Sequence, residues 1–299
     1  MELRQLAYFV AIAEERNFTR AAQRIPIAQP AISQQIRRLE AELGERLFLR
    51  GRRGITLPPA GQARLPPARA ALGAAEGGRQ VVAALGGLLT GRLAVGHVHP
   101  LPDRRFLRLL GAFHRTYPGI ELALLEDQTD ALLAALAAGQ RDAALIGQGR
   151  YDRPPPEVAS LLVAREPVVV AVHPTHPLAG RGQIRLRALR EEPMVTLTRA
   201  SKLRSTLETA CHAAGFAPRI AAETSDLGVM VQLAAEQLGV AVLPASGLAG
   251  TTELVQLRLT HPELDRRLLL VWRPASSPPA GRAFLALARQ HLTPPPGST

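Results

Sequence analysis

Cysteine and aromatic residues are scarce in this chain of 299 residues, and long apolar runs are missing. Cys211 is the only cysteine, so neither an intramolecular disulfide nor a zinc site built from several cysteines can form. No apolar run reaches the roughly 18 residues that a membrane-spanning helix needs. A secretory signal is not expected, because Glu2, Arg4 and Gln5 interrupt the apolar pattern at the start. We therefore expect a cytoplasmic protein without a membrane partner, in which Cys211 is a small buried residue of a helix.

Acidic residues are fewer than basic ones, and the motifs of common enzymes are absent. The chain has 36 basic residues against 25 acidic ones, a formal net charge of +11, and Lys202 is its only lysine. This balance favours a polyanionic partner such as nucleic acid. There is no G-x-S-x-G elbow, no H-E-x-x-H helix and no phosphate-binding glycine loop. His97 and His99 lie two residues apart, but no carboxylate or cysteine accompanies them at ligand spacing. We therefore expect no catalysis, no metal site and no cofactor.

Helical periodicity and many arginines mark residues 1–58 as a first domain. Apolar residues recur at helical spacing from Leu3 to Ala13, and Thr19 is a suitable N-cap for a second helix ending near Arg24. Pro30 suits the first turn of a third helix, which Gly44 would end as a C-terminal glycine. Two short apolar segments, residues 47–49 and 54–57, then flank an arginine-rich turn. Two short helices across a tight turn, followed by such a ribbon, predict a winged helix-turn-helix, a DNA-binding geometry.

Polar residues on the third helix and in the ribbon are the candidates for DNA contacts. Serine and glutamine can hydrogen-bond to base edges, and arginine reaches phosphates or guanine. The alternative is a solvated basic helix in an ordinary bundle. The candidates are Thr19, Gln29, Pro30, Ser33, Gln34, Arg37, Arg38, Arg50, Arg52 and Arg53.

The run AAQRIPIAQPAISQQIRRLEAELGERLFLRGRRGITLPPAG resembles the N-terminal signature of the LysR-type transcriptional regulators, and LRQLAYFVAIAEERNFTRAA before it is similar to that family's first helices. The resemblance implies that the helix from Pro30 reads the major groove and that the wing lies along the minor groove. By position, Gln29, Pro30, Ser33 and Gln34 fall at base-facing sites. Arg37 and Arg53 fall at backbone or minor-groove sites.

Residues 59–90 occupy the place of the family's long linker helix, which pairs with another subunit. Pro66 and Pro67 are expected to interrupt this helix, and Gly73, Gly77 and Gly78 weaken it further. We expect a linker and dimerisation segment, hence a homodimer or homotetramer, with the helix interrupted at 66–67.

Short apolar strands alternate with amphipathic helices from residue 91 to residue 299. The β-α-β-α-β order predicts parallel sheets with right-handed crossovers. About ten alternating elements suggest two α/β lobes, with lobe I at about 91–163 and 265–299 and lobe II at about 164–264. The arrangement resembles the type 2 periplasmic-binding-protein fold that the LysR-type family uses as its effector domain. Fragments such as GRLAVG, FHRTYPGIELAL and LAAEQLGVAVLPAS follow that family's pattern in order.

Ligands in open α/β sheets bind at the carboxyl ends of strands, near helix N-termini. The family pattern places the residues there in the cleft between the lobes. Helix capping is the alternative explanation for Thr129, Ser201 and Ser225. The candidates for effector contacts are His99, Pro100, Leu101, Gln128, Thr129, Gly147, Gln148, Thr198, Arg199, Ser201, Lys202 and Ser225.

The sequence thus predicts a transcriptional regulator that binds double-stranded DNA at a partly palindromic operator. We expect its effector to be a small molecule bound between the lobes, and an anion rather than a cation. The reason is that Arg199, Lys202 and Arg204 lie around the start of a helix. RNA polymerase is a further candidate partner. The competing hypothesis is a solute-binding protein with a basic N-terminal extension, and sequence preference in DNA binding at raised salt separates the two.

Overall fold

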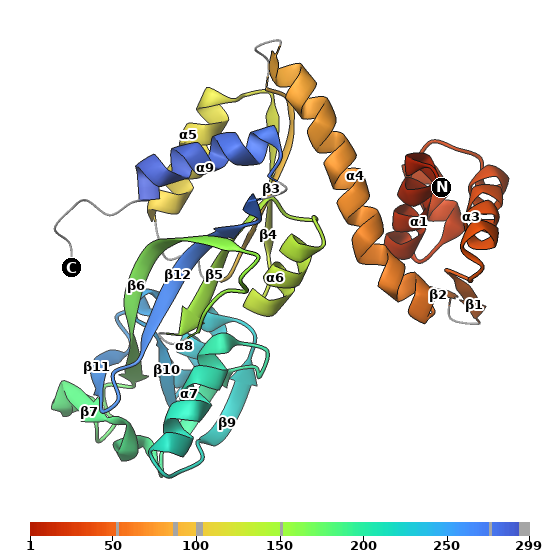
Figure 1. Cartoon of the computed structure of the whole chain (residues 1–299). Coiled ribbons are helices and arrows are strands. Elements are labelled where there is room, and N and C mark those ends of the chain that lie inside the picture. The colour runs from red at the N-terminus through yellow and green to blue at the C-terminus, as the bar shows by residue number, and fades with distance from the viewer. Residues whose placement is uncertain (52–53, 86–88, 100–103, 150–151, 275–276, 293–299) are drawn as a thin grey trace.

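The structure is a computed structural model, which describes residues 1–51, 54–85, 89–99, 104–149, 152–274 and 277–292. The side chains of residues 50–51 and 79–85 are outside this description. A small N-terminal domain is joined by one long helix to a two-lobed α/β region (Figure 1).

The N-terminal domain packs three helices and a two-stranded ribbon around one apolar core, as the sequence predicts for a winged helix-turn-helix. Its core forms because the helices place apolar residues three or four positions apart. Phe48, which follows the third helix, joins this core, with its ring centroid 5.3 Å from that of Phe9 and 5.7 Å from that of Phe18. The elements are α1 (Leu3–Glu15), α2 (Phe18–Arg24), α3 (Gln29–Leu43), β1 (Leu49–Gly51) and β2 (Gly54–Thr56).

The C-terminus of α3 lies where the sequence predicts it, but the N-cap of α2 is a different residue from the one predicted. Gly44 ends α3 in the left-handed conformation, with φ of 71°, as expected of a C-terminal glycine. The expectation that Thr19 caps the second helix is wrong. Asn17 is the N-cap of α2, and its side-chain oxygen accepts hydrogen bonds from the backbone N–H groups of Thr19 at 2.8 Å and Arg20 at 3.1 Å. Asparagine is at least as good a cap as threonine, and it comes early enough for Phe18 to begin the helix.

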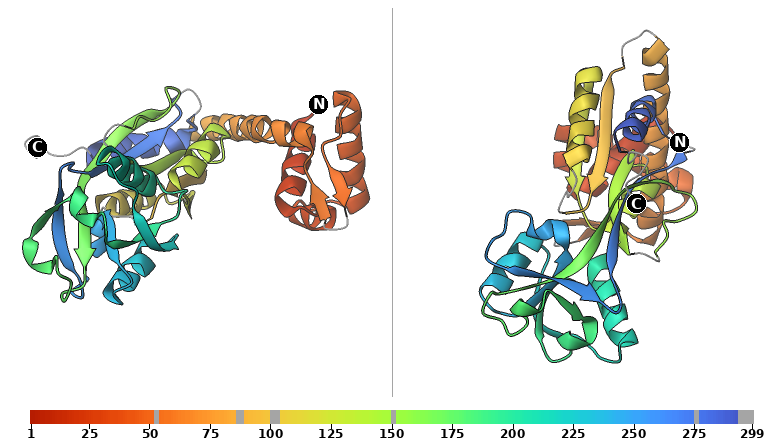
Figure 2. Two further views of the ribbon diagram at one scale, coloured as in Figure 1. Left: turned by 90° about the horizontal axis from the view of Figure 1, so that it is seen from below. Right: turned by 90° about the vertical axis from the view of Figure 1, so that its left-hand side faces the viewer.

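One helix, α4 (Pro59–Leu85), leads from the N-terminal domain to the α/β region, as Figure 2 shows in its left view. The expected interruption at Pro66 and Pro67 is wrong, because helical geometry continues through both residues. Each proline removes one backbone donor, which leaves the carbonyls of Gln62 and Ala63 without a helical partner. Both prolines and both of these residues are exposed, so solvent can satisfy the two carbonyls.

Lobe I contains a five-stranded sheet in the order β4-β3-β5-β12-β6. The first three strands are parallel and β12 is antiparallel to both of its neighbours. Two helices, α5 and α9, pack on one face, where the rings of Phe113 and Phe284 meet at 5.6 Å. On the other face α6 lies so close that a Cβ at Gly96 would meet Leu132. The elements are β3 (Gly91–His97), α5 (Arg104–Thr116), β4 (Ile120–Glu126), α6 (Thr129–Ala137), β5 (Ala143–Gly149), β6 (Ala159–Val172), β12 (Asp265–Trp272) and α9 (Pro279–Leu292).

Lobe II continues from the second half of β6 in the order β6-β10-β8-β9, with β11 on the other side of β6 and β7 beside β11. The helices α7 and α8 cover this sheet. Sequence patterning did not reveal β7 or β11. The elements are η1 (Ala179–Arg181), β7 (Gln183–Arg185), η2 (Leu186–Leu189), β8 (Pro193–Leu197), α7 (Lys202–Ala213), β9 (Arg219–Thr224), α8 (Leu227–Ala235), β10 (Val240–Pro244), η3 (Ala245–Leu248) and β11 (Val255–Thr260).

Two strands connect the lobes, as the right view of Figure 2 shows. The long strand β6 pairs with β12 up to Pro167 and with β10 and β11 from Val168 onward. The chain returns to lobe I through β12, which begins at Asp265. The crossing lies at Pro167 and Asp265, which pair directly. Consequently the carboxyl ends of β3 and β5 in lobe I face lobe II across the crossing.

Candidate functional site

The outward face of α3 carries the polar residues that the sequence predicts for DNA contacts. Ile32, Ile36 and Leu39 are buried against the other helices, so the opposite face is turned to solvent. Gln29 donates a hydrogen bond from Nε2 to Oγ of Ser33 at 2.9 Å, which orients both side chains on that face. The exposed residues of the face and its approach are Thr19, Pro30, Gln34, Arg37 and Arg38.

Arg37 and Arg38 have no salt bridge or hydrogen bond to any side chain in the described parts of the chain. Their charges are therefore available to phosphates. The strands β1 and β2, which follow α3 in the chain, pair antiparallel as a short ribbon (Figure 1). The Arg50 side chain, Arg52 and Arg53 lie outside the described residues.

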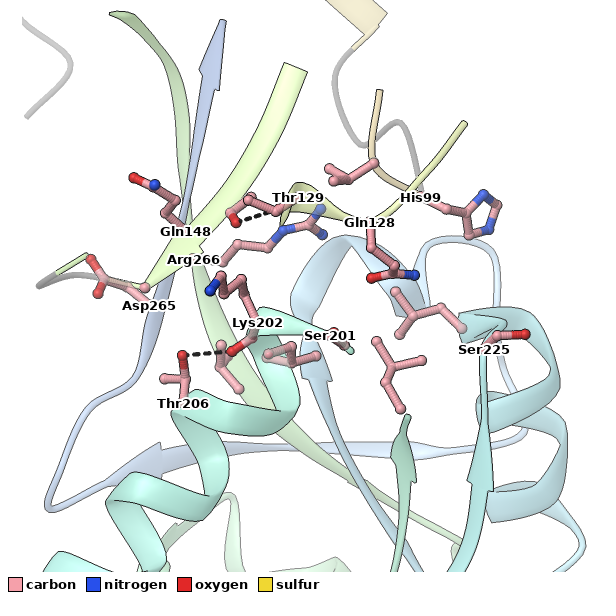
Figure 3. A pocket seen from close by; sticks show the side chains of 17 residues that line it. His99, Gln128, Thr129, Gln148, Ser201, Lys202, Thr206, Ser225, Asp265 and Arg266 are labelled. Atoms are coloured by element: carbon pink, nitrogen blue, oxygen red, sulfur yellow. Dashed lines mark hydrogen bonds between the residues drawn. The ribbon is translucent and has the colours of Figure 1, made fainter. Parts of the chain in front are cut away.

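A pocket lies where the two lobes meet, and both lobes contribute its walls (Figure 3). Its empty space is about 630 Å³, a volume that includes the open solvent at its mouth. Apolar side chains form part of the wall and polar ones the rest. The lining residues are Val98, His99, Gln128, Thr129, Gly147, Gln148, Gly149, Val168, Leu197, Ser201, Lys202, Leu203, Thr206, Ser225, Leu227, Asp265 and Arg266.

The pocket brings together most of the residues expected at the cleft from the sequence alone. Pro100 and Leu101 lie outside the described residues. Figure 3 shows the side chain of Gln148 turned away from the other labelled side chains. The predicted residues that line the pocket are His99, Gln128, Thr129, Gly147, Gln148, Ser201, Lys202 and Ser225.

Thr198 and Arg199, also predicted at the cleft, are not among the residues that line this pocket. The strand β8 ends at Leu197, and the backbone N–H of Thr198 donates to the carbonyl of Thr224 at 3.0 Å. This bond holds Thr198 beside the next strand. Arg199 is exposed in the turn that follows.

The N-termini of α6 and α7 enter the pocket from opposite lobes. The N-cap residues Gln128 of α6 and Ser201 of α7 make no side-chain capping bond, so the first N–H groups of both helices remain open. Ser201 is only 6% exposed, and its hydroxyl has no hydrogen bond to any described residue. A helix N-terminus carries partial positive charge and unpaired donors, which suits an anion.

Helix capping, the alternative explanation for Thr129, Ser201 and Ser225, is not seen at any of the three residues. The hydroxyl of Thr129 donates to the carbonyl of Gly147 at 2.9 Å, and Ser201 makes no capping bond. Asp226, next to Ser225, caps α8 by accepting from the N–H of Val229 at 2.9 Å. This bond lowers the pKa of Asp226. Ser225 therefore lies in the pocket without a capping role.

Lys202 connects the two lobes. Its Nζ lies 3.1 Å from Oδ1 of Asp130, which belongs to the first turn of α6. Both side chains keep substantial exposure, 37% for Lys202 and 68% for Asp130. Solvent screening makes such a pair weak, on the order of 0–1 kcal/mol. It can therefore be exchanged for another partner at little cost.

Sequence reasoning missed Arg266, the most deeply buried charge among the described residues that line the pocket. Its residue is 9% exposed, and Nη1 lies 3.5 Å from Oε1 of Glu166. Burial lowers the pKa of Arg266, and the Glu166 carboxylate opposes this shift. The pairing of Arg266 with Glu166 across β12 and β6 could not be seen without the register of these strands.

Cys211 is buried in α7, as expected for a small residue of a helix. Burial raises its thiol pKa to about 11, with Glu208 adding to the effect and Arg204 opposing it. No group of three or more histidine, cysteine, aspartate or glutamate residues within the described ranges could hold a metal ion. None of the helices in those ranges is both long and apolar enough to cross a membrane.

Comparison with protein families accounts for nearly the whole chain. Residues 3–62 match the model described as "Bacterial regulatory helix-turn-helix protein, lysR family". Residues 86–293 match the model described as "LysR substrate binding domain". The protein therefore belongs to the LysR family of transcriptional regulators, and it is a DNA-binding regulator with an effector-binding domain.

Individual relatives extend over the same length. The chain is 32% identical over 292 residues to the HTH-type transcriptional regulator ShiR of Corynebacterium glutamicum (strain R), covering 96% of this chain and 98% of that protein. It is 33% identical over 278 residues to a probable hydrogen peroxide-inducible genes activator of Mycobacterium avium, covering 91% of this chain and 88% of that protein. The crystal structure of full-length CbnR with its target DNA is similar, with a TM-score of 0.67, 27% identity and coverage of 97% of this chain and 100% of CbnR.

Family membership confirms the predicted class and fold, and it excludes the competing solute-binding hypothesis, because the helix-turn-helix model covers the basic N-terminal segment. It likewise confirms that the protein is not an enzyme, because the LysR family consists of regulators.

Proposed function

We propose that this regulator recognises its operator through α3 and responds to a small anionic effector bound between lobes I and II. The observation that carries the second half is the pocket in which two uncapped helix N-termini, one from each lobe, face the same space. Because the ligand would touch both lobes, its binding changes their relative position. As a DNA-binding regulator of bacterial type, the protein acts in the cytoplasm.

On DNA, Ser33 and Gln34 contact base edges, while Arg37 and Arg38 contact phosphates. The support is their position on the solvent face of α3 and the freedom of both arginines from ion pairs among the described residues. Gln34→Ala should weaken cognate binding by about 1–3 kcal/mol and leave nonspecific binding nearly unchanged. Arg37→Ala should weaken all sequences alike and reduce the salt slope by about one.

A fluorescence-anisotropy titration with cognate and scrambled duplexes at several salt concentrations measures both effects. If Gln34→Ala weakens both duplexes equally, Gln34 is a backbone contact and the assignment fails. An unchanged salt slope for Arg37→Ala removes Arg37 from the interface.

The operator is partly palindromic because the protein acts as a homodimer or a larger homo-oligomer, with α4 as the pairing element. The 27 residues of α4 span about 40 Å, long enough for a helix-helix seam. Leu107 on α5 and Leu124 and Leu125 on the edge strand β4 offer further exposed apolar surface. Sedimentation at micromolar concentration tests this, and a monomer would contradict it. RNA polymerase is the partner through which an activator would act.

A contact path exists from the effector domain to the DNA-binding domain. At one end of the path, Nη2 of Arg69 on α4 lies 2.9 Å from Oε1 of Glu14 on α1. A few residues further along α4, Gly73 and Gly77 approach Gly139 and Pro278 of lobe I so closely that a Cβ at either glycine would be in contact. We therefore expect an effector-induced shift of lobe I to reach α1, changing half-site spacing or DNA bending.

Matched acid and amide probes test the effector half of the proposal. Isobutyrate, cyclohexanecarboxylate and phenylacetate are compared with isobutyramide, cyclohexanecarboxamide and phenylacetamide by thermal shift at constant ionic strength. At least one acid should raise the melting temperature above its amide, since a ligand at about a hundred times its Kd stabilises by about 2.7 kcal/mol. The variant Ser201→Ala/Lys202→Ala should lose this difference while keeping operator affinity. If acids and amides act alike on the native protein, the anionic effector is wrong.

Peroxide sensing is the other function that the comparisons raise, because the M. avium relative is named a peroxide-inducible gene activator. The buried Cys211, with its raised pKa, argues against a thiol sensor here. We therefore propose a ligand-responsive regulator.

A further inference from the structure

Arg266 has more hydrogen-bond donors than partners. A guanidinium carries five N–H donors. In the described parts of the chain its only polar partner is Glu166, at 3.5 Å, and no hydrogen bond to it is formed. Buried donors are rarely left unpaired in proteins. Figure 3 shows the guanidinium directed into the pocket, towards Thr129 and Gln128.

Glu166 does not satisfy this guanidinium. Its Oε2 accepts the backbone N–H of Ser246 at 3.3 Å, and its Oε1, which faces Arg266, has no hydrogen bond. Lys202, which with Arg266 supplies the arginine and lysine charges among the described lining residues, is closer to its carboxylate partner and more exposed. Of the two cations, Arg266 is thus the more desolvated and the less satisfied.

Gly147 fixes where the guanidinium lies. A Cβ at this position would be 2.7 Å from Nε of Arg266 and 3.2 Å from Nη2, so only glycine allows the side chain to lie flat against β5. The guanidinium plane is held between this strand and the pocket. A fixed fork of donors in a desolvated place is pre-organised for a planar acceptor with two oxygens.

We propose that Arg266 binds the carboxylate of the effector in a two-pronged hydrogen bond and thereby selects carboxylic acids over neutral ligands of the same shape. This inference rests on the proposed function and makes Arg266 the principal anchor of the ligand, ahead of Ser201 and Lys202 at the start of α7. The hydroxyl of Ser201 and the side-chain amide of Gln128, neither of which makes a capping hydrogen bond, flank the bound acid. Because Arg266 pairs with Glu166 at the crossing of β6 and β12, a ligand on it touches the hinge between the lobes directly.

Two variants separate charge from geometry. Arg266→Lys keeps the charge and removes the planar fork, whereas Gly147→Ala keeps Arg266 and displaces its guanidinium. Arg258→Met is the matched control, since Arg258 is an exposed cation on β11 that pairs with Glu263. The probes are the same three acids and three amides, with affinity measured by titration calorimetry and thermal shift on the full chain.

Both variants should weaken each binding acid by about ten- to hundredfold, the value of a charged hydrogen bond, and leave the amides unchanged. Arg258→Met should bind acids as the native protein does. Circular dichroism and operator affinity verify that each variant is folded. If Arg266→Lys does not fold, Arg266→Met/Glu166→Gln removes both charges together and should give the same loss of acid binding.

The outcomes distinguish the two proposals. If acids bind the native protein and bind both variants equally well, Arg266 is not the anchor, while the proposed function stands. If Ser201→Ala/Lys202→Ala abolishes acid binding while Arg266→Lys and Gly147→Ala both bind acids as the native protein does, the anchor is at the start of α7. If no acid is preferred over its amide by the native protein, the proposed function fails, and this inference with it.

Discussion

Hydrogen peroxide should leave the DNA binding of this protein unchanged, although relatives are named for peroxide induction. The thiolate is the form of cysteine that reacts. With the pKa of Cys211 at about 11, its thiolate fraction at pH 7 is about 0.01%, against about 3% for an ordinary thiol near 8.5, a ratio of roughly 300. The thiol is also fully buried, so a reagent reaches it only through local opening.

The assay measures the rate of sulfenic acid formation by mass spectrometry after trapping, on the native protein and on the same protein in denaturant. The native thiol should react at least roughly 300-fold more slowly at pH 7. Its rate should rise about tenfold per pH unit towards pH 11, whereas the unfolded thiol should level off above about pH 9.

Cys211→Ser is the matched variant for DNA binding. Native protein and variant should bind the operator equally well before and after peroxide treatment. The reasoning is refuted if peroxide changes operator affinity in the native protein but not in Cys211→Ser.

Three further predictions concern stability. Asn17→Ala should lower the free energy of unfolding of the N-terminal domain by about 1–2 kcal/mol, because one side chain caps two N–H groups of α2, and Asn17→Asp should retain most of it in urea unfolding. Asp226→Ala should destabilise lobe II at neutral pH, and the difference should vanish at low pH. Because the pKa of Asp226 is lowered in the folded state, its stabilisation is present above the unfolded pKa and is lost as the pH falls through the folded pKa. Equal differences at all pH values would contradict this. Gly61→Ala should destabilise the junction of α4 with the N-terminal domain by about 1–3 kcal/mol, because its Cβ would clash with the backbone oxygen of Leu47. An unchanged melting curve would contradict this.

Most of the fold could be predicted from local patterns in the sequence. Periodicity gave the helices and most strands, and Gly44 marked the end of α3. The order of elements placed eight of the pocket residues at one site, since strand ends and helix starts coincide in open α/β sheets. The continuity of α4 was not predicted, because a proline inside a helix normally leaves a carbonyl without a hydrogen-bond partner. The sequence did not show that Gln62 and Ala63, whose carbonyls are freed, are exposed to solvent.

Contacts between distant segments could not be read in this way. Arg266 and Glu166 are 100 positions apart and meet only through the register of two strands. The Lys202–Asp130 pair requires the packing of one lobe on the other. The strand β11 alternates apolar and polar residues over its length, but its place beside β6 depends on pairing with a segment far away in the sequence. In each case the missing information was tertiary.

The return of the chain to lobe I makes this lobe the last part of the protein that can be completed. The N-terminal domain and lobe II are each encoded by one uninterrupted stretch, so they can fold as soon as they leave the ribosome. The sheet of lobe I lacks its strand β12 between β5 and β6, and its helix α9, until residues 265–292 have been made. Until then two long strands have unpaired edges, which are templates for association with other chains. A chain that stops after Thr260 would carry an intact DNA-binding domain attached to an unfinished, aggregation-prone lobe.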